Sequence, residues 1–367
     1  MDGNYEAVQA KALAAKGHEV TVIAVKYRNF FTHAFSWSKI RQRKVDGVNV
    51  YECNRYNFYN SVIYRHKLDM LLRQKQFFRV FKHMVRQIGL PDVVHAHIIQ
   101  WAAPAVIIKE KYHLPFVITE HWTKMNANIT PSLTMQKTFA YSQADKVICV
   151  SDALAANLKR KCDIDSTVIH NMVSDKFFQG QKKVRNNGAF RFIAVGGLRL
   201  NKRFDILVDA FALCHFPGNV SLDIVGEGEE RTLIEKRILE NGLSEKVKLL
   251  GVKTPEEVNE LLCQSDCFVL SSRLETFAIV LIEAMAKGLP VIATKCGGPE
   301  TFVRPEDGLL VEKENASELA KAMMYLKDHS HEYDCDEIRQ HCYNNFSQDV
   351  IANKIIDVYN QVLKQTR

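Results

Sequence analysis

Short apolar runs rich in β-branched residues alternate along the chain with segments whose apolar residues recur at helical spacing. Such runs are typical of parallel strands in a sheet that is covered by helices on both faces. In the first half of the chain the predicted strands are 18–25, 92–97, 115–121, 146–151 and 166–171. Their alternation with helices predicts an α/β architecture with a parallel sheet.

One polar segment interrupts this alternation. Residues 174–189 are polar and contain two glycines and two asparagines, which predicts a linker. The alternation then restarts, and the predicted strands of the second half are 190–197, 220–228, 246–251, 267–272, 290–294 and 308–312.

The two halves predict two Rossmann-like, doubly wound parallel-sheet domains that face a cleft. We expect an N-terminal domain over 1–173, the linker over 174–189 and a C-terminal domain over 190–345. A C-terminal helix within 346–367 is expected to pack back on the N-terminal domain. Ligands of such sheets bind at the carboxyl ends of the strands, so the cleft is the expected site.

Composition narrows the class of protein. Of the 367 residues, 47% are hydrophobic and 25% are charged, the balance of a globular protein. No apolar run reaches the roughly 18–20 residues that span a bilayer, and the first residues lack the apolar core of a signal peptide. The nine cysteines include no CxxC pair, which favours buried free thiols over a disulfide or zinc framework. We therefore expect a cytoplasmic protein.

The net charge of +7 is unevenly distributed. Residues 26–86 contain fourteen Lys or Arg against three acidic residues, an excess of +11, so the remainder carries −4. Aromatic residues are interleaved with these cations. One interpretation is a solvated helix face beside core aromatics, and the other is a surface that meets an anionic lipid layer or an anionic substrate. No RRM, KH or helix-turn-helix pattern supports a nucleic-acid partner.

A single carboxylate lies in the most apolar predicted helix. The segment 271–294 predicts a helix that begins near Thr276 or Phe277 and ends at Gly288. Glu283 is surrounded there by apolar residues, and an unpaired buried carboxylate is costly. Glu283 therefore meets either a buried cation, as a structural ion pair, or a polar ligand.

Glu275 precedes Glu283 by eight residues, just ahead of the same helix. At ~1.5 Å per residue the two lie about 12 Å apart, too far to hold one sugar ring. They suit two ends of an extended ligand, with the free N–H groups of the helix N-terminus between them for a phosphate. A nucleotide sugar, with its hexose, diphosphate and ribose, has this layout.

The Glu-x7-Glu pattern from Glu275 to Glu283, followed by AMAKGLPVIAT, resembles the donor site of retaining family-4 glycosyltransferases of GT-B fold. The resemblance covers nearly the whole chain. The segment VGGLRLNKRFDILVDAFA is similar to the family's phosphate loop, and Lys202 matches its lysine. Gly197 stands where the family has an arginine, and Arg199 is the nearby candidate to replace it.

Weaker matches extend along the chain. LDIVGEGEE and VKLLGV are similar to the segments beside the nucleotide base, and VIHNMVSDKFF to the segment that crosses between domains. TEHW matches the loop whose histidine, here His121, approaches the donor sugar, and ATKCGGPETF resembles the glycine-rich turn after the donor helix. The residues expected to bind the donor are Glu283, Arg199, Gly197, Thr276, Phe277, Val252 and Gly3.

The resemblance implies roles for these residues. Glu275 would bind sugar hydroxyls, Glu283 the ribose, and Lys202 with Arg199 the diphosphate, while His121 would position the sugar. The resemblance further implies retention of configuration, with the departing phosphate helping to deprotonate the acceptor. No metal or other cofactor is expected, because fixed cations and helix N-termini neutralise the phosphates.

The expected function is sugar transfer in cell-surface polysaccharide or glycolipid biosynthesis. The implied partners are a nucleotide sugar and a glycan or polyprenyl-diphosphate-linked acceptor. The basic stretch would place the protein at the inner face of the cell membrane through contact with anionic lipid.

Other interpretations stay open. Gly226-Glu227-Gly228 would suit a nicotinamide oxidoreductase, but the third glycine of that pattern is replaced by Arg231. His95 and His97 share a strand face and could form a metal site with His121, although polar residues lining the cleft are the preferred interpretation. The departure at Gly197 is compatible with a catalytically inactive partner subunit.

The start of the chain departs most from the family, whose members open with a strand and a glycine-bearing loop. Met1 falls inside that loop, and Gly3 is the candidate for its remaining glycine. The absent strand would be central, between 18–25 and 92–97, and its loss would leave backbone groups unpaired. We therefore expect the 367-residue chain to be poorly soluble or inactive, and upstream codons to restore it.

Overall fold

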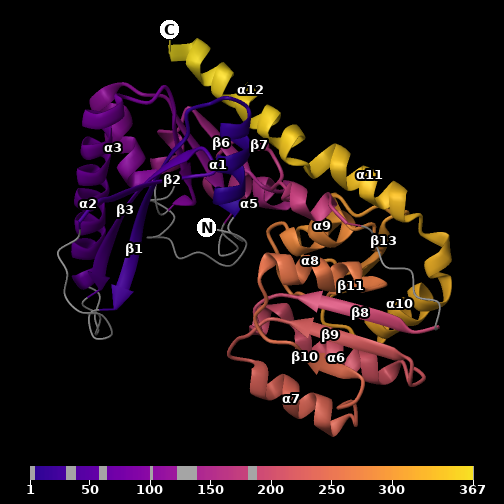
Figure 1. Cartoon of the computed structure of the whole chain (residues 1–367). Helices are drawn as coiled ribbons and strands as arrows, with labels where there is room; N and C mark the ends of the chain where they lie inside the picture. Colours follow the sequence, from indigo (N-terminus) through magenta and orange to yellow (C-terminus); the bar gives the residue numbers. More distant parts are fainter. Residues whose placement is uncertain are drawn as a thin grey trace.

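The computed structural model is an α/β protein with two domains side by side (Figure 1). It describes residues 5–29, 39–57, 64–99, 102–121, 139–180 and 188–366. The predicted fold class is confirmed, because parallel sheets form the centre of both halves. The nine cysteines are free thiols, as expected, and seven of them are buried, whereas Cys263 and Cys335 are partly exposed. No described helix is long and apolar enough to cross a membrane.

The C-terminal domain contains one parallel sheet of six strands. Its order is β10-β9-β8-β11-β12-β13, so the first strand of the domain lies beside the fourth. This is the doubly wound order, and its switch point falls between β8 and β11. The strands are β8 (Phe190–Val195), β9 (Val220–Val225), β10 (Val247–Leu249), β11 (Cys267–Leu270), β12 (Val291–Thr294) and β13 (Gly308–Val311).

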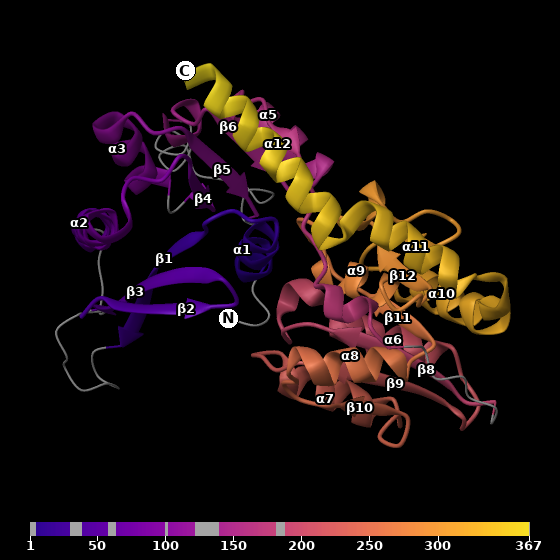
Figure 2. The ribbon, with the colours of Figure 1, turned by 45° about the horizontal axis from the view of Figure 1, so that its top comes forward.

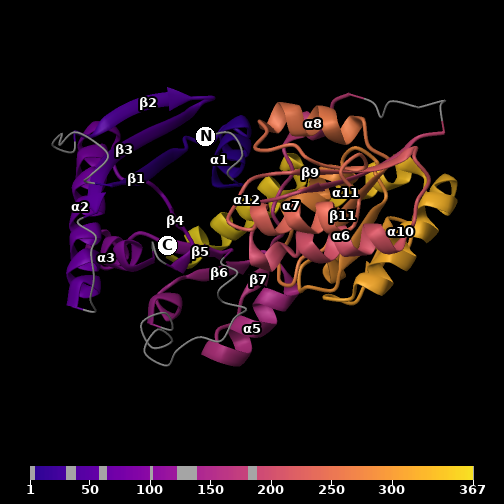
Figure 3. The ribbon, with the colours of Figure 1, turned by 90° about the horizontal axis from the view of Figure 1, so that it is seen from below.

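Helices cover both faces of this sheet (Figure 3). One face is covered by α6 (Phe204–Leu213), α7 (Arg231–Glu240) and α10 (Ala316–His329). The other carries α8 (Pro255–Cys263), α9 (Ile279–Met285) and α11 (Cys335–Phe346). α9 is shorter than the predicted helix at both ends, because the chain adopts a left-handed conformation at Ala278 and turns at Gly288. The sequence pattern did not predict α11.

The N-terminal domain divides its described strands between two sheets. One is parallel and contains β4 (Val94–His97), β5 (Phe116–Glu120), β6 (Lys146–Cys149) and β7 (Thr167–Val168) in that order. The other has the order β1-β3-β2, with β1 (Thr21–Asn29) parallel to β3 (Val48–Asn57) and β2 (Arg41–Val45) antiparallel to it. Among the described residues β1 and β4, expected in one sheet, thus belong to separate sheets.

The hairpin of β2 and β3 was not predicted. Its turn is Asp46-Gly47, and both residues have positive φ, at 49° and 81°. An Asp-Gly pair of this kind is a strong hairpin signal. It was obscured because β2 is a charged edge strand whose first four residues are exposed, so it lacks the apolar run that marks the other strands.

The helices of the N-terminal domain are α1 (Tyr5–Ala15), α2 (Tyr64–Ile88), α3 (Ala102–Tyr112) and α5 (Asp152–Cys162). The last helix, α12 (Gln348–Thr366), leaves the C-terminal domain and packs on α1 (Figure 2). Ile355 and Val358 of α12 share a buried apolar cluster with Leu13 of α1. The chain therefore crosses between the domains twice, before β8 and at α12.

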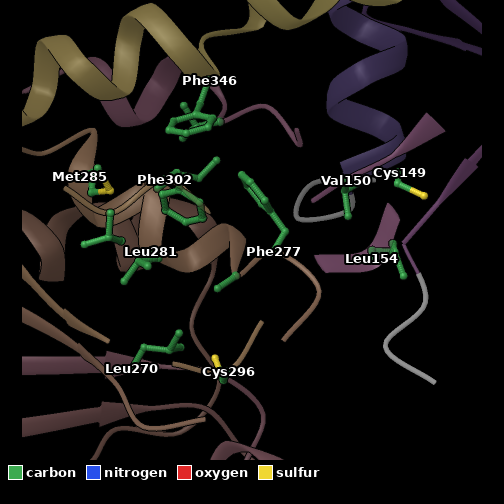
Figure 4. Packing of buried hydrophobic residues seen from close by; sticks show 14 of the residues in the cluster. Cys149, Val150, Leu154, Leu270, Phe277, Leu281, Met285, Cys296, Phe302 and Phe346 are labelled. Carbon is green, nitrogen blue, oxygen red and sulfur yellow. The ribbon is translucent and has the colours of Figure 1, made fainter. Parts of the chain in front are cut away.

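The two domains also share a buried apolar cluster (Figure 4). Phe277 contacts the rings of Phe302 and Phe346, with centroids 5.0 and 5.8 Å apart. Val150 and Leu154 of the N-terminal domain belong to the same cluster. This packing holds the loop before α9 against the N-terminal domain.

Candidate active site

Two loops interlock at the carboxyl ends of β8 and β9. A Cβ atom at Gly226, where φ is +143°, would lie 1.9 Å from the backbone oxygen of Gly196. A Cβ atom at Gly228 would lie 2.2 Å from that of Leu198. No side chain fits at either distance, so backbone packing accounts for both glycines without a dinucleotide.

Lys202 and Glu275 meet at the switch point of the sheet. Lys202 lies in the loop after β8, and its Nζ is 2.5 Å from Oε1 of Glu275, in the loop after β11. The hydroxyl of Ser272 donates to the same oxygen at 2.7 Å. Glu275 is buried and Lys202 is partly exposed. A cation and a carboxylate, 73 residues apart in sequence, thus form one site.

The other expected donor residues of this domain lie around that pair. Gly197 and Arg199 are exposed on the loop after β8. Val252 follows β10 and is 75% exposed, which is unusual for a valine. The loop that carries it is anchored by the Gly226 N–H, which donates to the Gly251 carbonyl at 2.9 Å. Gly3 lies outside the described residues.

The loop from Glu275 to Ala278 contacts the N-terminal domain directly. The Thr276 hydroxyl donates to the backbone carbonyl of His121 at 3.1 Å. Phe277 was expected at the donor, but the residue is 1% exposed and its side chain lies in the shared apolar cluster. Ala278 has φ of 72°, a left-handed conformation that L-residues other than glycine rarely adopt.

Glu283 occupies the middle of α9, half-buried. Burial raises its pKa to about 8, and the nearby Lys176 opposes that rise. Lys176 belongs to the crossing segment and pairs with Glu256 at 2.8 Å. Glu283 therefore takes up a proton at a higher pH than an exposed glutamate does.

Glu120 is a buried site residue that sequence reasoning missed. Its carboxylate accepts hydrogen bonds from the backbone N–H of Ile99 at 3.1 Å and of His121 at 2.9 Å. It also accepts one from the Tyr141 hydroxyl at 2.7 Å. The only signal in the sequence was an acidic residue at the end of an otherwise apolar strand.

Ile98, beside this carboxylate, has φ of 66°. A left-handed conformation is a genuine outlier for a β-branched residue and costs about 1–3 kcal/mol. Glu120 and the bond from Ile98 N–H to the Thr119 carbonyl at 2.9 Å offset this strain. Strain of this kind is concentrated at functional sites.

His95, His97 and His121 do come together at the ends of β4 and β5, as the strand pattern suggested. The ring centroids of His95 and His97 are 4.5 Å apart, and those of His97 and His121 are 5.4 Å apart. Within the described part of the chain, no group of three His, Cys, Asp or Glu has the geometry to hold a metal ion.

Comparison with known families matches each half of the chain to a glycosyltransferase model. The model described as glycosyl transferases group 1 matches residues 175–349. The model described as glycosyltransferase family 4 matches residues 5–177. The two matches together cover both domains.

Individual proteins agree with these models. An uncharacterized glycosyltransferase of Methanocaldococcus jannaschii is 30% identical over 258 residues, which cover 68% of this chain and 69% of that protein. A sucrose-phosphate synthase from Thermosynechococcus elongatus has the same fold, with a TM-score of 0.82, 22% identity and coverage of 98% and 93% of the two chains. HepE of Anabaena, solved with UDP and glucose, has a TM-score of 0.67, 21% identity and coverage of 77% and 82%.

Proposed function

Because this chain belongs to the group 1 glycosyltransferases, with a family 4 domain in its N-terminal half, we propose that it moves a sugar from a nucleotide-diphosphate sugar to a glycan or lipid-linked acceptor with retention of configuration. One observation carries the proposal. Lys202 and Glu275 meet at the switch point of the C-terminal sheet, and Thr276 connects their site to His121. A cation for a diphosphate and a carboxylate for sugar hydroxyls thus lie where open α/β sheets bind ligands.

In this proposal the nucleotide sugar binds the C-terminal domain. Lys202 and Arg199 neutralise the charge that builds on the diphosphate as it leaves, the preorganised electrostatic contribution that is usually the largest in catalysis. Glu275 accepts hydrogen bonds from the sugar, and His121 positions it from the other domain. These fixed cations do the work that a metal ion does in other phosphate sites, so the proposed reaction is metal-independent.

The proposed transfer forms one bond and breaks one. The acceptor hydroxyl oxygen bonds to the anomeric carbon on the face from which the diphosphate departs, and the bond from that carbon to the phosphate oxygen breaks. The acceptor proton passes to the departing phosphate oxygen. Configuration is therefore retained.

A panel of nucleotide sugars tests the proposal. Calorimetry should find one donor that binds, with UDP-glucose as the first probe because HepE was solved with UDP and glucose. Transfer to glycan and polyprenyl-diphosphate acceptors should follow, and NMR of the product should show the anomeric configuration of the donor. Binding without transfer to any acceptor would favour the inactive partner subunit, and an inverted product would exclude retention.

Glu283→Gln should weaken donor binding and also raise stability at alkaline pH. The pKa of Glu283 rises from 4.5 in the unfolded chain to about 8 in the folded protein, so the free energy of unfolding falls as pH increases between these values. The glutamine variant lacks this fall. Its melting temperature should match that of wild type below about pH 4 and exceed it above about pH 8.

If the ionised form of Glu283 accepts ribose hydroxyls, wild-type donor affinity should increase from about pH 6.5 to 8.5, and the variant should lose both the affinity and this dependence. Calorimetric titration across this range measures it. A variant that melts at lower temperature than wild type at every pH, yet transfers sugar normally, would make Glu283 structural.

The N-terminal domain offers a basic surface for a lipid-linked acceptor. Lys75, Arg79, Lys82 and Arg86 are exposed on α2 at spacings that place them on one face. Ile88 and Leu90 follow and are 40% and 50% exposed. In all three ribbon views α2 lies on the side of its domain away from the C-terminal domain (Figures 1, 2 and 3). We propose that this face contacts anionic lipid. Many of the other basic residues of 26–86 lie outside the residues whose side chains the structure describes.

Lys75→Gln combined with Arg86→Gln should lower binding to anionic vesicles roughly 30-fold at low salt, since each basic residue near such a surface contributes about 1 kcal/mol. Sedimentation with vesicles measures this, and high salt should remove the difference. Lys236→Gln with Lys248→Gln, an equal loss of exposed charge on the C-terminal domain, is the control. Equal effects of the two double variants, or equal binding to neutral vesicles, would contradict the proposal.

A further inference from the structure

Three histidine rings form a stack behind the loop that carries His121. His95 and His97 project from the same face of β4, and His121 follows the neighbouring strand β5. The planes of His95 and His97 are inclined by 20°, and those of His97 and His121 by 19°. Tyr5 of α1 lies on His121, with ring centroids 3.9 Å apart. The ring of His121 thus contacts both His97 and Tyr5, whose own ring centroids are 6.4 Å apart.

The hydrogen bonds of the three rings differ. Both nitrogens of His95 have partners within the protein: Nδ1 is 2.6 Å from the Tyr359 hydroxyl, and Nε2 is 2.6 Å from the Thr119 hydroxyl. His95 thereby ties β4 to β5 and to α12. His97 differs, because its Nδ1 is 3.2 Å from Nε2 of His121. His97 therefore contacts the proposed site residue, whereas His95 contacts the scaffold.

All three rings are neutral at physiological pH. Burial lowers the pKa of His97 to about 4 and places the pKa values of His95 and His121 well below their usual range. The neighbouring His97 lowers the pKa of His121 further, and the Asn171 side chain opposes this. Two neutral imidazoles whose nitrogens face each other share one proton, so the tautomer of one ring determines that of the other.

The second nitrogen of His121 is Nδ1. Among the described residues it is buried and makes no hydrogen bond within the geometric limits, although the Asn171 side chain is close enough to raise the pKa of the ring. Buried polar atoms are normally satisfied, so an unsatisfied ring nitrogen next to the loop of Thr276 marks the place of a ligand group.

We propose that His97 is a positioning residue, which holds the ring of His121 in one orientation and couples the tautomers of the two rings, so that Nδ1 meets the donor sugar. This inference rests on the proposed function for the identity of the ligand. The positioning itself rests on the contact between the two rings. Glu120 complements His97, because it holds the backbone of His121 while His97 holds the ring.

The test uses three variants in the full chain. His97→Leu removes the hydrogen bond and keeps an apolar side chain in the stack. His97→Asn places an amide near the position of Nδ1 and should restore the bond. His83→Leu removes a partly buried imidazole elsewhere in the same domain and is the control.

The first measurement is the tautomer of His121, from long-range ¹H–¹⁵N spectra of protein with ¹⁵N-labelled histidine, assigned with His121→Gln. We expect the ratio of the two His121 tautomers to be the same in wild type and His83→Leu and to change in His97→Leu, while His97→Asn, whose amide can donate or accept, restores the hydrogen bond to Nε2. An unchanged His121 signal in His97→Leu would overturn the proposal. This measurement needs no substrate, so it decides the positioning even if the chain transfers no sugar.

The second measurement is a double-mutant cycle on transfer. His97→Leu should lower kcat roughly tenfold or more, because small misplacements of a positioned group are costly, with donor affinity within about threefold. In the His121→Gln background it should have less than about a twofold further effect. If the two losses multiply instead, His97 acts through the general structure of the domain and the proposal is wrong.

Discussion

Lys202→Ala should lower kcat/KM roughly 10²-fold or more, on the scale observed when one preorganised charge-stabilising group is lost. Lys202 is the cation at the switch point of the C-terminal sheet, and its Nζ already lies 2.5 Å from Glu275. Since charge accumulates on the diphosphate as the sugar leaves, the loss should be larger in kcat than in donor affinity. Steady-state kinetics and calorimetry with the same donor separate the two.

Two control variants sharpen this prediction. Lys248→Ala removes an exposed lysine from the edge strand of the same sheet and should leave activity unchanged. Arg199→Ala tests the alternative phosphate ligand on the same loop. If Lys202→Ala stays within about threefold of wild type while Arg199→Ala loses 10²-fold, the roles of the two residues must be exchanged.

Glu275→Gln should weaken binding of the nucleotide sugar by roughly 10- to 10²-fold, because hydrogen bonds to a charged group contribute about 1.5–3 kcal/mol. Binding of the nucleotide diphosphate alone should be unchanged or stronger. Glu275 is proposed to contact only the sugar. In the free protein Glu275 also pairs with Lys202, so its removal leaves Lys202 available to the diphosphate. Calorimetry with UDP-glucose and UDP compares the two ligands.

A common loss for both ligands would indicate that Glu275 acts on the phosphates through Lys202. No loss for either would remove Glu275 from the donor site. Glu257→Gln is a suitable control, since Glu257 is a partly exposed carboxylate that bonds to Thr254 in the capping box of α8 rather than to Lys202. It should change stability slightly and leave the affinity for both ligands unchanged.

The central strands of the C-terminal domain could be predicted from the sequence because β8, β9, β11 and β12 are short apolar runs that are mostly buried on both faces. Phe192, Ile193 and Ala194 of β8 are fully buried, for example. The elements that were missed lack such runs. β2 is a charged edge strand, and α11 buries only Ile338, Cys342 and Phe346 among polar residues. The spacing of apolar residues indicates which segments are buried, so it does not predict a strand or helix that is mostly exposed.

The candidate site was partly visible in the sequence. Lys202, Glu275 and Glu283 were identified from the spacing of residues within short segments and from the resemblance of those segments to a known family. The contact between the rings of His97 and His121 and the bonds from Ile99 and Tyr141 to Glu120 were not, because each joins atoms that come from different elements. The position of Phe277 in the apolar cluster was likewise invisible, since its partners Phe302 and Phe346 lie far along the chain.

The sequence by itself determined the segments that form the buried strands and most of the helices, and which residue types are available for phosphate and sugar. Only the tertiary structure decided which of these residues meet. Lys202 reaches Glu275 because β8 lies beside β11 in the sheet, and Thr276 reaches His121 because the crossing segment and α12 bring the two domains together. Apolar periodicity is a local property that records burial, whereas strand order and domain contact depend on pairings between distant segments, which no local pattern encodes.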